Sequence, residues 1–304
     1  MSFKSQSAME YLMTYGWAIL IIAIVMVALF QLGVFNGTFF APRATAGACE
    51  VYRSVEGINL VGQCQGELPQ FVAQFNGQNS YININNSTVF DFNGFTLNAW
   101  IRPVPNGIIG YTDEGIINKN GNIIGSPSGS SESYLLTLEQ GPSYPPYISP
   151  SGFVITSNGE MWIGSGLTPS ANYWYFITLS FDKTTYLEKI YVDGVLENSL
   201  SANGPIVNNN AALGIGGRGS ASGQPYRIFN GLIANVQVYN ATLSANQIGV
   251  LYQEGVGGAP IDPTHIVGWW PLNGNAQDYS GNNNGGVPTN VVYTSSWTSG
   301  YTQP

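Results

Sequence analysis

The pattern of hydrophobic positions divides the chain into two different parts. Residues 11–35 contain no charged residue and no proline, so they form one apolar run that only Thr14 and Gln31 interrupt. At about 1.5 Å per residue, a helix of this length measures roughly 37 Å, which is enough to cross a bilayer. From residue 70 onward, short alternating runs are separated by turn-forming residues, a pattern typical of β-strands. We predict a long N-terminal helix followed by a β-rich head.

Two segments of the head carry clear strand patterns. From Tyr173 to Phe181 every odd-numbered position is apolar and is opposed by Thr178 and Ser180, which predicts a strand with one buried face. Residues 189–196 place Asp-Gly between β-branched residues, which is the strongest short-range signal for a β-hairpin. Antiparallel strands joined by tight turns are therefore expected.

A further strand followed by a helix is predicted within residues 232–252. Alternate apolar positions in residues 232–238 are expected to line one face of the strand. Ser244 and Gln247 then match a capping box, in which each residue satisfies a backbone N–H of the other. This pattern predicts one short helix that ends at Tyr252.

Composition supports a β-rich head and excludes nucleic acid as a partner. Only 9% of the residues are charged, 13% are aromatic and 38 are glycine, which favours short strands and turns over amphipathic helices. The formal net charge is −8, and the nine Lys and Arg residues are scattered along the chain. Binding to phosphates requires clustered cations, which this sequence lacks.

The only two cysteines, Cys49 and Cys64, lie close together after the apolar run. An isolated pair of this kind suits an oxidising compartment, and we predict a disulfide that staples a neck formed by residues 37–68. The alternative is a pair of thiols in a reducing cell, against which the upstream membrane segment argues. A loop of this size should stabilise the fold by roughly 3 kcal/mol.

A carboxylate, Glu10, stands at the start of the apolar run, where an ionised group needs a cation or the membrane interface. The segment Lys4–Tyr11 resembles the class III signal peptide of archaeal type IV pilins. This resemblance implies cleavage by a prepilin peptidase between Ser5 and Gln6, and no long-term residence in lipid. It further implies that Glu10 pairs with the α-amino group of a neighbouring subunit, so that residues 6–36 assemble into an extracellular filament.

Three other roles for the N-terminal segment stay open. It could be a plain single-pass membrane anchor, because an apolar helix alone does not show whether it leaves the bilayer. It could be an unusually long secretory signal. It could be a lipoprotein signal ending at Cys49, although Pro42 and Arg43 separate that cysteine from the apolar run.

Several stretches of the head, in this order, resemble the laminin-G-like or concanavalin A-like jelly roll. The matching stretches are Ala73–Ile82, Phe95–Pro103, Trp174–Phe176 with Tyr191–Gly194, and Phe229–Val236 with Leu243–Ser244. The resemblance implies an antiparallel sandwich of two sheets over residues 69–304. A leader (residues 1–5), a helix (residues 6–36) and the neck would precede it.

The segment Trp269–Gly285 looks like the first strand and loop of such domains, yet it stands near the C-terminus. It is too apolar to be exposed, so we predict that it pairs with a sheet of its own subunit. Pairing with a neighbouring subunit, or a truncated second copy, are the alternatives.

Relatives of this fold often bind Ca²⁺ in the loop that follows this strand, and the alternative here is a hydrogen-bonded Asx-rich turn. The candidate ligands are Asp278, Ser280, Asn282 and Asn284.

Carbohydrate binding is the chemistry that the head favours. No Glu-x-Asp-x-x-Glu motif of the glucan-hydrolysing relatives is present, and the sole histidine, His265, stands in a predicted loop, so we predict no enzyme. Heads of this type often hold sugars by stacking on aromatic rings, although each such ring is more often part of a core. The candidates are Trp162 and Trp174, followed by Tyr175 and Trp297.

Asn-x-Ser/Thr sequons occur at Asn36, Asn85, Asn86 and Asn240. Glycosylation of Asn36, Asn86 or Asn240 is expected if the chain is exported. Two function classes remain: a filament subunit that displays a lectin-like head, and a membrane-anchored carbohydrate-binding protein that does not polymerise. No cofactor is required in either case.

Overall fold

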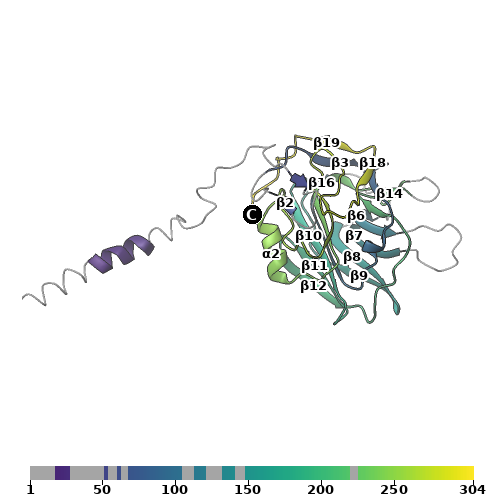
Figure 1. Cartoon of the computed structure of the whole chain (residues 1–304), viewed down its shortest axis with the longest axis horizontal. Coiled ribbons are helices and arrows are strands. Elements are labelled where there is room, and N and C mark those ends of the chain that lie inside the picture. The colour runs from purple at the N-terminus through teal and green to yellow at the C-terminus, as the bar shows by residue number, and fades with distance from the viewer. Residues whose placement is uncertain are drawn as a thin grey trace, which may run out of the picture. The chain divides into compact units, whose positions relative to one another are not determined.

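The computed structural model describes residues 18–27, 51–53, 60–62, 68–104, 113–120, 132–140, 148–219 and 225–304. The chain divides into two compact units, Met1–Arg43 and Ala44–Pro304. The first unit contains one described helix, and the second contains the strands (Figure 1).

The described helix of the first unit covers residues 18–27, and all of its residues are exposed. Ile19, Leu20, Ile21 and Ile22 are consecutive and at least half exposed, so apolar side chains lie on all sides of the helix. This helix is shorter than the one predicted over residues 6–36, whose remaining residues lie outside the described part of the chain. Within the residues that the structure describes, no helix combines the length and hydropathy needed to span a bilayer.

The described regular secondary structure of the second unit is mostly β-strand. In chain order these are β1 (Val51–Arg53), β2 (Leu60–Gly62), β3 (Val72–Asn76), β4 (Tyr81–Ile84), β5 (Phe95–Pro103), β6 (Glu114–Asn120), β7 (Glu132–Gln140), β8 (Ile148–Thr156), β9 (Gly159–Gly164), β10 (Tyr175–Asp182), β11 (Leu187–Val192), β12 (Val195–Ser201), β13 (Leu213–Ile215), β14 (Arg218–Gly219), β15 (Pro225–Tyr226), β16 (Asn230–Tyr239), β17 (Ile266–Trp270), β18 (Gly286–Thr289) and β19 (Val292–Thr294). Two helices accompany them, the 3-10 helix η1 (Thr88–Phe90) and the α-helix α2 (Ala245–Gln253).

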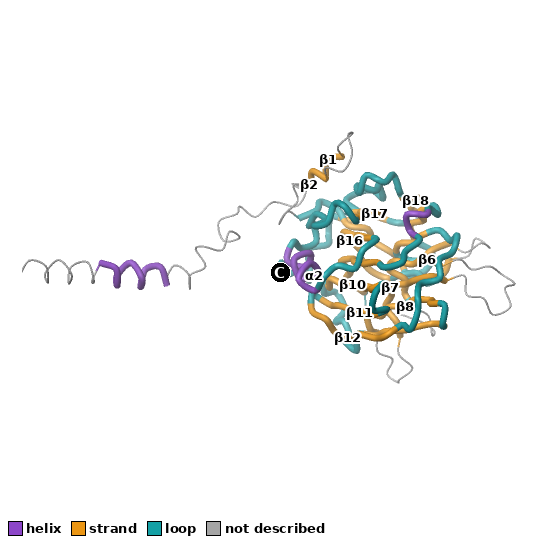
Figure 2. The backbone as a smooth tube through the Cα atoms, turned by 60° about the horizontal axis from the view of Figure 1, so that its bottom comes forward, coloured by secondary structure: helices purple, strands orange, loops and turns teal. Residues whose placement is uncertain are grey.

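The strands form two large sheets that stack as a sandwich (Figures 1 and 2). The eight-stranded sheet has the order β12-β11-β10-β5-β16-β3-β19, with β17 also paired to β16. The seven-stranded sheet has the order β18-β4-β13-β6-β7-β8-β9. All described pairings within these sheets are antiparallel. This arrangement confirms the predicted antiparallel sandwich.

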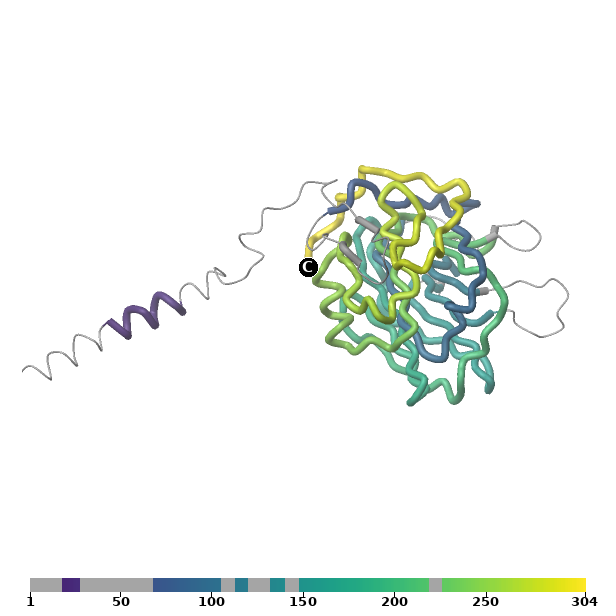
Figure 3. Tube along the Cα trace, viewed as in Figure 1, coloured from purple at the N-terminus to yellow at the C-terminus, as the bar shows by residue number. Residues whose placement is uncertain are grey.

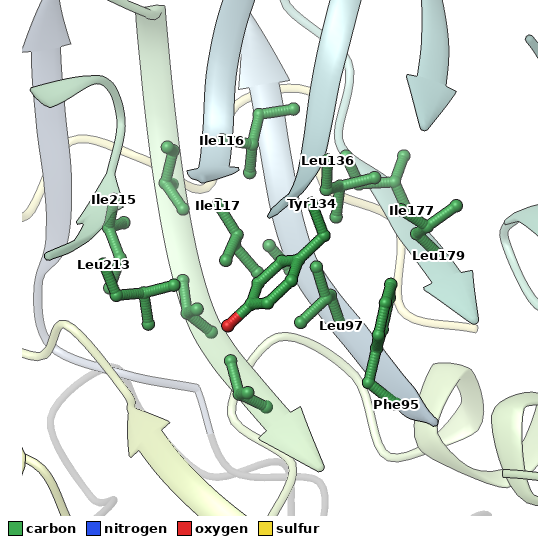
Figure 4. Close-up of a cluster of buried hydrophobic side chains, with 14 of the residues drawn as sticks. Phe95, Leu97, Ile116, Ile117, Tyr134, Leu136, Ile177, Leu179, Leu213 and Ile215 are labelled. Carbon is green, nitrogen blue, oxygen red and sulfur yellow. The ribbon is translucent and has the colours of Figure 1, made fainter. Parts of the chain in front are cut away.

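The main hydrophobic core lies between the two sheets. Leu97 of β5 and Leu179 of β10 face Tyr134 and Leu136 of β7 across it, and all four are fully buried (Figure 4). Alternate residues of each strand point into this layer, as the period of two along a strand requires.

Strand β10 of the eight-stranded sheet is buried on both faces, whereas one buried face was predicted for the strand at Tyr173–Phe181. Thr178 and Ser180 of β10, on the face away from the main core, are fully buried. A second cluster covers that face, where Trp100 packs against Tyr252 of α2 with ring centroids 5.7 Å apart. The polar positions of β10 therefore lie beneath a third layer, which strand periodicity alone does not predict. Tyr173 lies outside β10 and is 58% exposed.

The prediction that one face of residues 232–238 is apolar throughout is wrong. Leu232 and Ala234 pack in the second cluster, whereas Val236 and Val238 pack in the main core. The pairing of β16 with β5 shifts register between Ala234 and Gln237, and Asn235 has a φ of 48°. This β-bulge inserts an extra residue and turns the rest of the strand over.

The predicted hairpin and capped helix are both confirmed. Asp193 and Gly194 join β11 to β12 with φ angles of 50° and 77°, the left-handed pair that a tight two-residue hairpin requires. At the start of α2, the Ser244 and Gln247 side chains accept from each other's backbone N–H groups. Local turn and cap chemistry thus places α2 on the eight-stranded sheet.

The C-terminal segment contributes strands to both sheets of its own chain. β17 pairs with β16, with Trp270 opposite Val236. β18 then pairs with β4 of the seven-stranded sheet, and β19 pairs with β3 of the eight-stranded sheet. Figure 3 shows this segment in yellow beside the dark blue β3. The prediction of pairing within the subunit is confirmed.

Candidate functional site

The face of the seven-stranded sheet that points away from the main core carries an aromatic row. On β8, Val154 faces the core, so Phe153 lies on the opposite, outer face. Leu135 of β7 is in register with Phe153, which is in register with Trp162 of β9. The Phe153 and Trp162 ring centroids are 4.6 Å apart. Leu135 and Phe153 are buried, and Trp162 at the edge of the row is half-buried.

A cluster of charged side chains gathers around Arg227, which follows β15. Its Nη2 lies 3.4 Å from an oxygen of Asp113 and 3.2 Å from an oxygen of Glu132. Arg218 and Arg227 place their guanidinium carbons 5.1 and 5.2 Å from the centroid of the Tyr226 ring. Tyr226 is 38% exposed. Cation–π contacts and ion pairs thus hold these side chains together.

Glu139 of β7 completes this group, which we call the Arg227 cluster: Asp113, Glu132, Glu139, Arg218, Tyr226 and Arg227. Burial raises the pKa of the Glu139 carboxyl and the charge of Asp113 raises it further. Burial also raises the pKa of the Asp113 carboxyl, against the opposing effect of Arg227. Glu139 and Phe153 both belong to the outer-face set of alternating positions on β7 and β8, so the cluster and the aromatic row share one face.

Glu114 lies next to the cluster at the start of β6. Burial raises the pKa of its carboxyl to about 7, although the Asn230 backbone N–H donates to it at 3.2 Å. Glu114 stands opposite Leu138, whose side chain is in the main core, so its carboxyl points toward the other sheet and not onto the outer face.

Trp174 does not fit the predicted role in glycan stacking. It is 6% exposed, and its indole N–H donates to the Trp297 carbonyl oxygen at 2.9 Å. The two indoles pack edge to face with centroids 5.9 Å apart, and Trp297 is fully buried. Tyr175 is half-buried, and its hydroxyl accepts from the Ser170 N–H at 2.8 Å. Of the four aromatic candidates, Trp162 alone lies on the outer face.

The loop after β17 is held by the chain's own donors. One Asp278 oxygen accepts from the Trp269 and Ser280 N–H groups at 3.0 and 2.8 Å. The other accepts from the Ser280 hydroxyl at 2.9 Å and the Asn284 N–H at 2.8 Å. The Asn282 and Asn284 amides donate to carbonyls of β17. This geometry favours a hydrogen-bonded turn, and calcium binding stays a prediction.

Other predicted residues fall into two groups. Asn85, Asn86 and Asn240 are exposed, as glycosylation requires. The remaining processing, assembly, disulfide and glycosylation residues lie outside the described residues: Ser5, Gln6, Glu10, Asn36, Cys49 and Cys64.

The described residues show no constellation for metal-assisted or histidine-based catalysis. His265 is exposed, and its Nδ1 lies 2.8 Å from an oxygen of Asp262. In the described ranges, no group of three or more His, Cys, Asp or Glu side chains could hold a metal ion.

Comparison with known protein families decides the classification of the head. Residues 76–249 match the family model described as the concanavalin A-like lectin/glucanases superfamily. The chain belongs to this superfamily. No curated protein sequence matches it. The concanavalin A-like fold covers more than half of the chain and includes both the aromatic row and the Arg227 cluster.

Solved structures share this concanavalin A-like fold at low sequence identity. A candidate carbohydrate-binding protein from Bacteroides ovatus is 18% identical, with a TM-score of 0.56 over 75% of this chain and 61% of that one. The chain therefore spans less than two thirds of that relative. A heptameric SAP-like pentraxin from Limulus polyphemus is 11% identical over 74% and 94% of the two chains (TM-score 0.49). The CBM40 domain of the Ruminococcus gnavus IT-sialidase, bound to α2,3-sialyllactose, is 12% identical over 60% and 96% (TM-score 0.46).

The Arg227 cluster was not predicted from the sequence. Its members come from β7, β14 and β15 and from the positions just before β6 and just after β15, so they are separated along the chain and only the topology brings them together.

Proposed function

We propose that this chain is a cell-surface protein that binds carbohydrate on the outer face of the seven-stranded sheet. The observation that carries the proposal is the half-buried ring of Trp162, held against Phe153 on the same face as the Arg227 cluster. Sugars bind proteins by stacking their apolar face on an aromatic ring and by hydrogen-bonding their hydroxyls to charged side chains. The superfamily and the Bacteroides ovatus structure support this proposal.

The cluster favours binding over hydrolysis. Asp113 and Glu132 both engage the Arg227 guanidinium group, which keeps them as fixed hydrogen-bond acceptors. A glycosidase needs one carboxyl free to donate a proton and a second free to attack or to activate water. Two carboxylates shared by one arginine are poorly suited to either role.

Replacing the aromatic ring tests the proposal. Trp162→Ala in the full-length protein should weaken glycan binding by about tenfold, since contact with an aromatic ring is worth about 0.5–1.5 kcal/mol beyond the apolar area that it buries. Tyr173→Ala is the matched control, because Tyr173 is an exposed aromatic residue outside the sandwich strands. Equal binding by the wild-type protein and Trp162→Ala would contradict the proposed site.

A second proposal concerns assembly: residues 6–36 form the core of a filament of the type IV pilin kind. The helix over residues 18–27 is apolar on all sides, and such a helix is stable only where lipid or other helices cover it. The segment that resembles a class III signal peptide, with Glu10, favours coverage by other helices in a filament after secretion. Electron microscopy of the cell surface, with N-terminal sequencing of isolated filaments, tests this. A chain that begins at Gln6 supports assembly, and an intact Met1 supports a membrane anchor.

A further inference from the structure

The Arg227 cluster contains more acidic than basic side chains. Three carboxylates, Asp113, Glu132 and Glu139, face two guanidinium groups, Arg218 and Arg227. Burial raises the pKa of Asp113 and Glu139 by more than the charge of Arg227 lowers it.

The arginine that could bind an anion is largely occupied. Arg227 is about 10% exposed, and its Nη2 already contacts Asp113 and Glu132. Its Nη1 is buried and has no hydrogen-bond partner within the described chain. A ligand carboxylate or sulfate binds best to both arms of a guanidinium fork. With Nη1 buried and Nη2 engaged by two carboxylates, Arg227 does not present a guanidinium fork to an anionic ligand.

The carboxylates offer what a polyol needs. Each ionised carboxylate has about four acceptor positions, and hydroxyl groups are donors as well as acceptors. Neighbouring sugar hydroxyls can therefore donate to Asp113 or Glu139. An added anion would meet the same carboxylates as like charges in a partly buried site, where repulsion is stronger than in water.

We propose that the outer face selects neutral glycans and rejects anionic ones through the Arg227 cluster. This inference rests on the proposed carbohydrate-binding function. Trp162 supplies a stacking surface for glycans of either charge. The Arg227 cluster distinguishes neutral glycans from anionic ones.

A glycan array tests the selectivity with the full-length protein. The array carries neutral oligosaccharides, each paired with its sialylated or uronic-acid counterpart. The neutral member of a pair should bind about tenfold more tightly, the effect of one like charge at 6–8 Å in a partly screened site. The double variant Asp113→Asn, Glu139→Gln should reduce this preference several-fold. Glu197→Gln is the control for loss of a carboxylate elsewhere, because Glu197 lies exposed on β12 of the other sheet.

The outcomes separate the two proposals. Equal or tighter binding of the anionic members would overturn the selectivity and leave carbohydrate binding intact. A neutral preference that the double variant does not alter, in a variant that unfolds like the wild type, would overturn the role of the cluster. Binding to no glycan of either class would refute the proposed function, and the selectivity with it.

Discussion

Glu188 is a buried carboxyl in the main core, and replacing it should change how stability depends on pH. It lies on β11 and faces the same side as Ile190, whose side chain is in the core. Neither carboxyl oxygen has a hydrogen-bond partner in the described chain. Gly152 of β8 leaves room for it, since a Cβ there would lie 3.1 Å from one Glu188 oxygen.

Burial raises the pKa of Glu188 from 4.5 to about 8. Between these values the folded state holds the proton and the unfolded state releases it, so the folded state binds more protons and its stability falls as pH rises. This difference in pKa changes the free energy of unfolding by at most about 5 kcal/mol between pH 4.5 and pH 8. Local relaxation and water entry reduce the change. The stabilising effect of the neutral carboxyl is complete below pH 4.5 and is lost as pH rises through about 8.

Glu188→Gln keeps the size of the side chain and removes its titration. Urea unfolding followed by tryptophan fluorescence should show similar free energies of unfolding for both proteins at pH 4.5. At pH 9 the variant should be more stable by several kcal/mol, in line with the linkage limit. Glu197→Gln, on the exposed strand β12, serves as the control. Equal stability of wild type and Glu188→Gln at pH 9 would refute the account of this buried carboxyl.

Three further predictions address the remaining proposals. Asp278→Ala should lower the free energy of unfolding by about 3 kcal/mol, because four donors lose a charged acceptor. EDTA should leave the Tm of the wild-type protein unchanged. A fall in Tm on chelation would support a calcium site instead. Cys49 and Cys64 are the chain's only two cysteines, so mass spectrometry should find a disulfide between them, and free thiols would contradict it. Glu10→Ala should leave the head folded and reduce the number of filaments, and normal filaments would count against the assembly role.

Local chemistry predicted several elements of the fold correctly. The Asp193–Gly194 turn, the capping box at Ser244 and the strand at Trp269–Trp270 depend on neighbouring residues, and each is found where expected. The bulge at Asn235 was missed because a single residue with left-handed backbone geometry inverts the faces of a strand without changing its apolar pattern.

Burial by a third layer could not be predicted from one strand at a time. Thr178 has the sequence pattern of a solvent-facing position, yet α2 and the C-terminal segment cover its face of the sheet. The same limitation applies to the tryptophans. Trp162 and Trp174 are equally plausible stacking platforms in the sequence, and only the packing of Trp174 against Trp297 distinguishes them.

Hydrogen exchange of the full-length protein, with and without a saturating neutral glycan, tests the carbohydrate-binding face most directly. The account predicts slower exchange in β8, β9 and the segment around Arg227, because a bound sugar covers Trp162 and the Arg227 cluster. It predicts no change in α2, which lies on the opposite sheet. Protection confined to α2 or to the loop after β17 would contradict the assignment of the outer face.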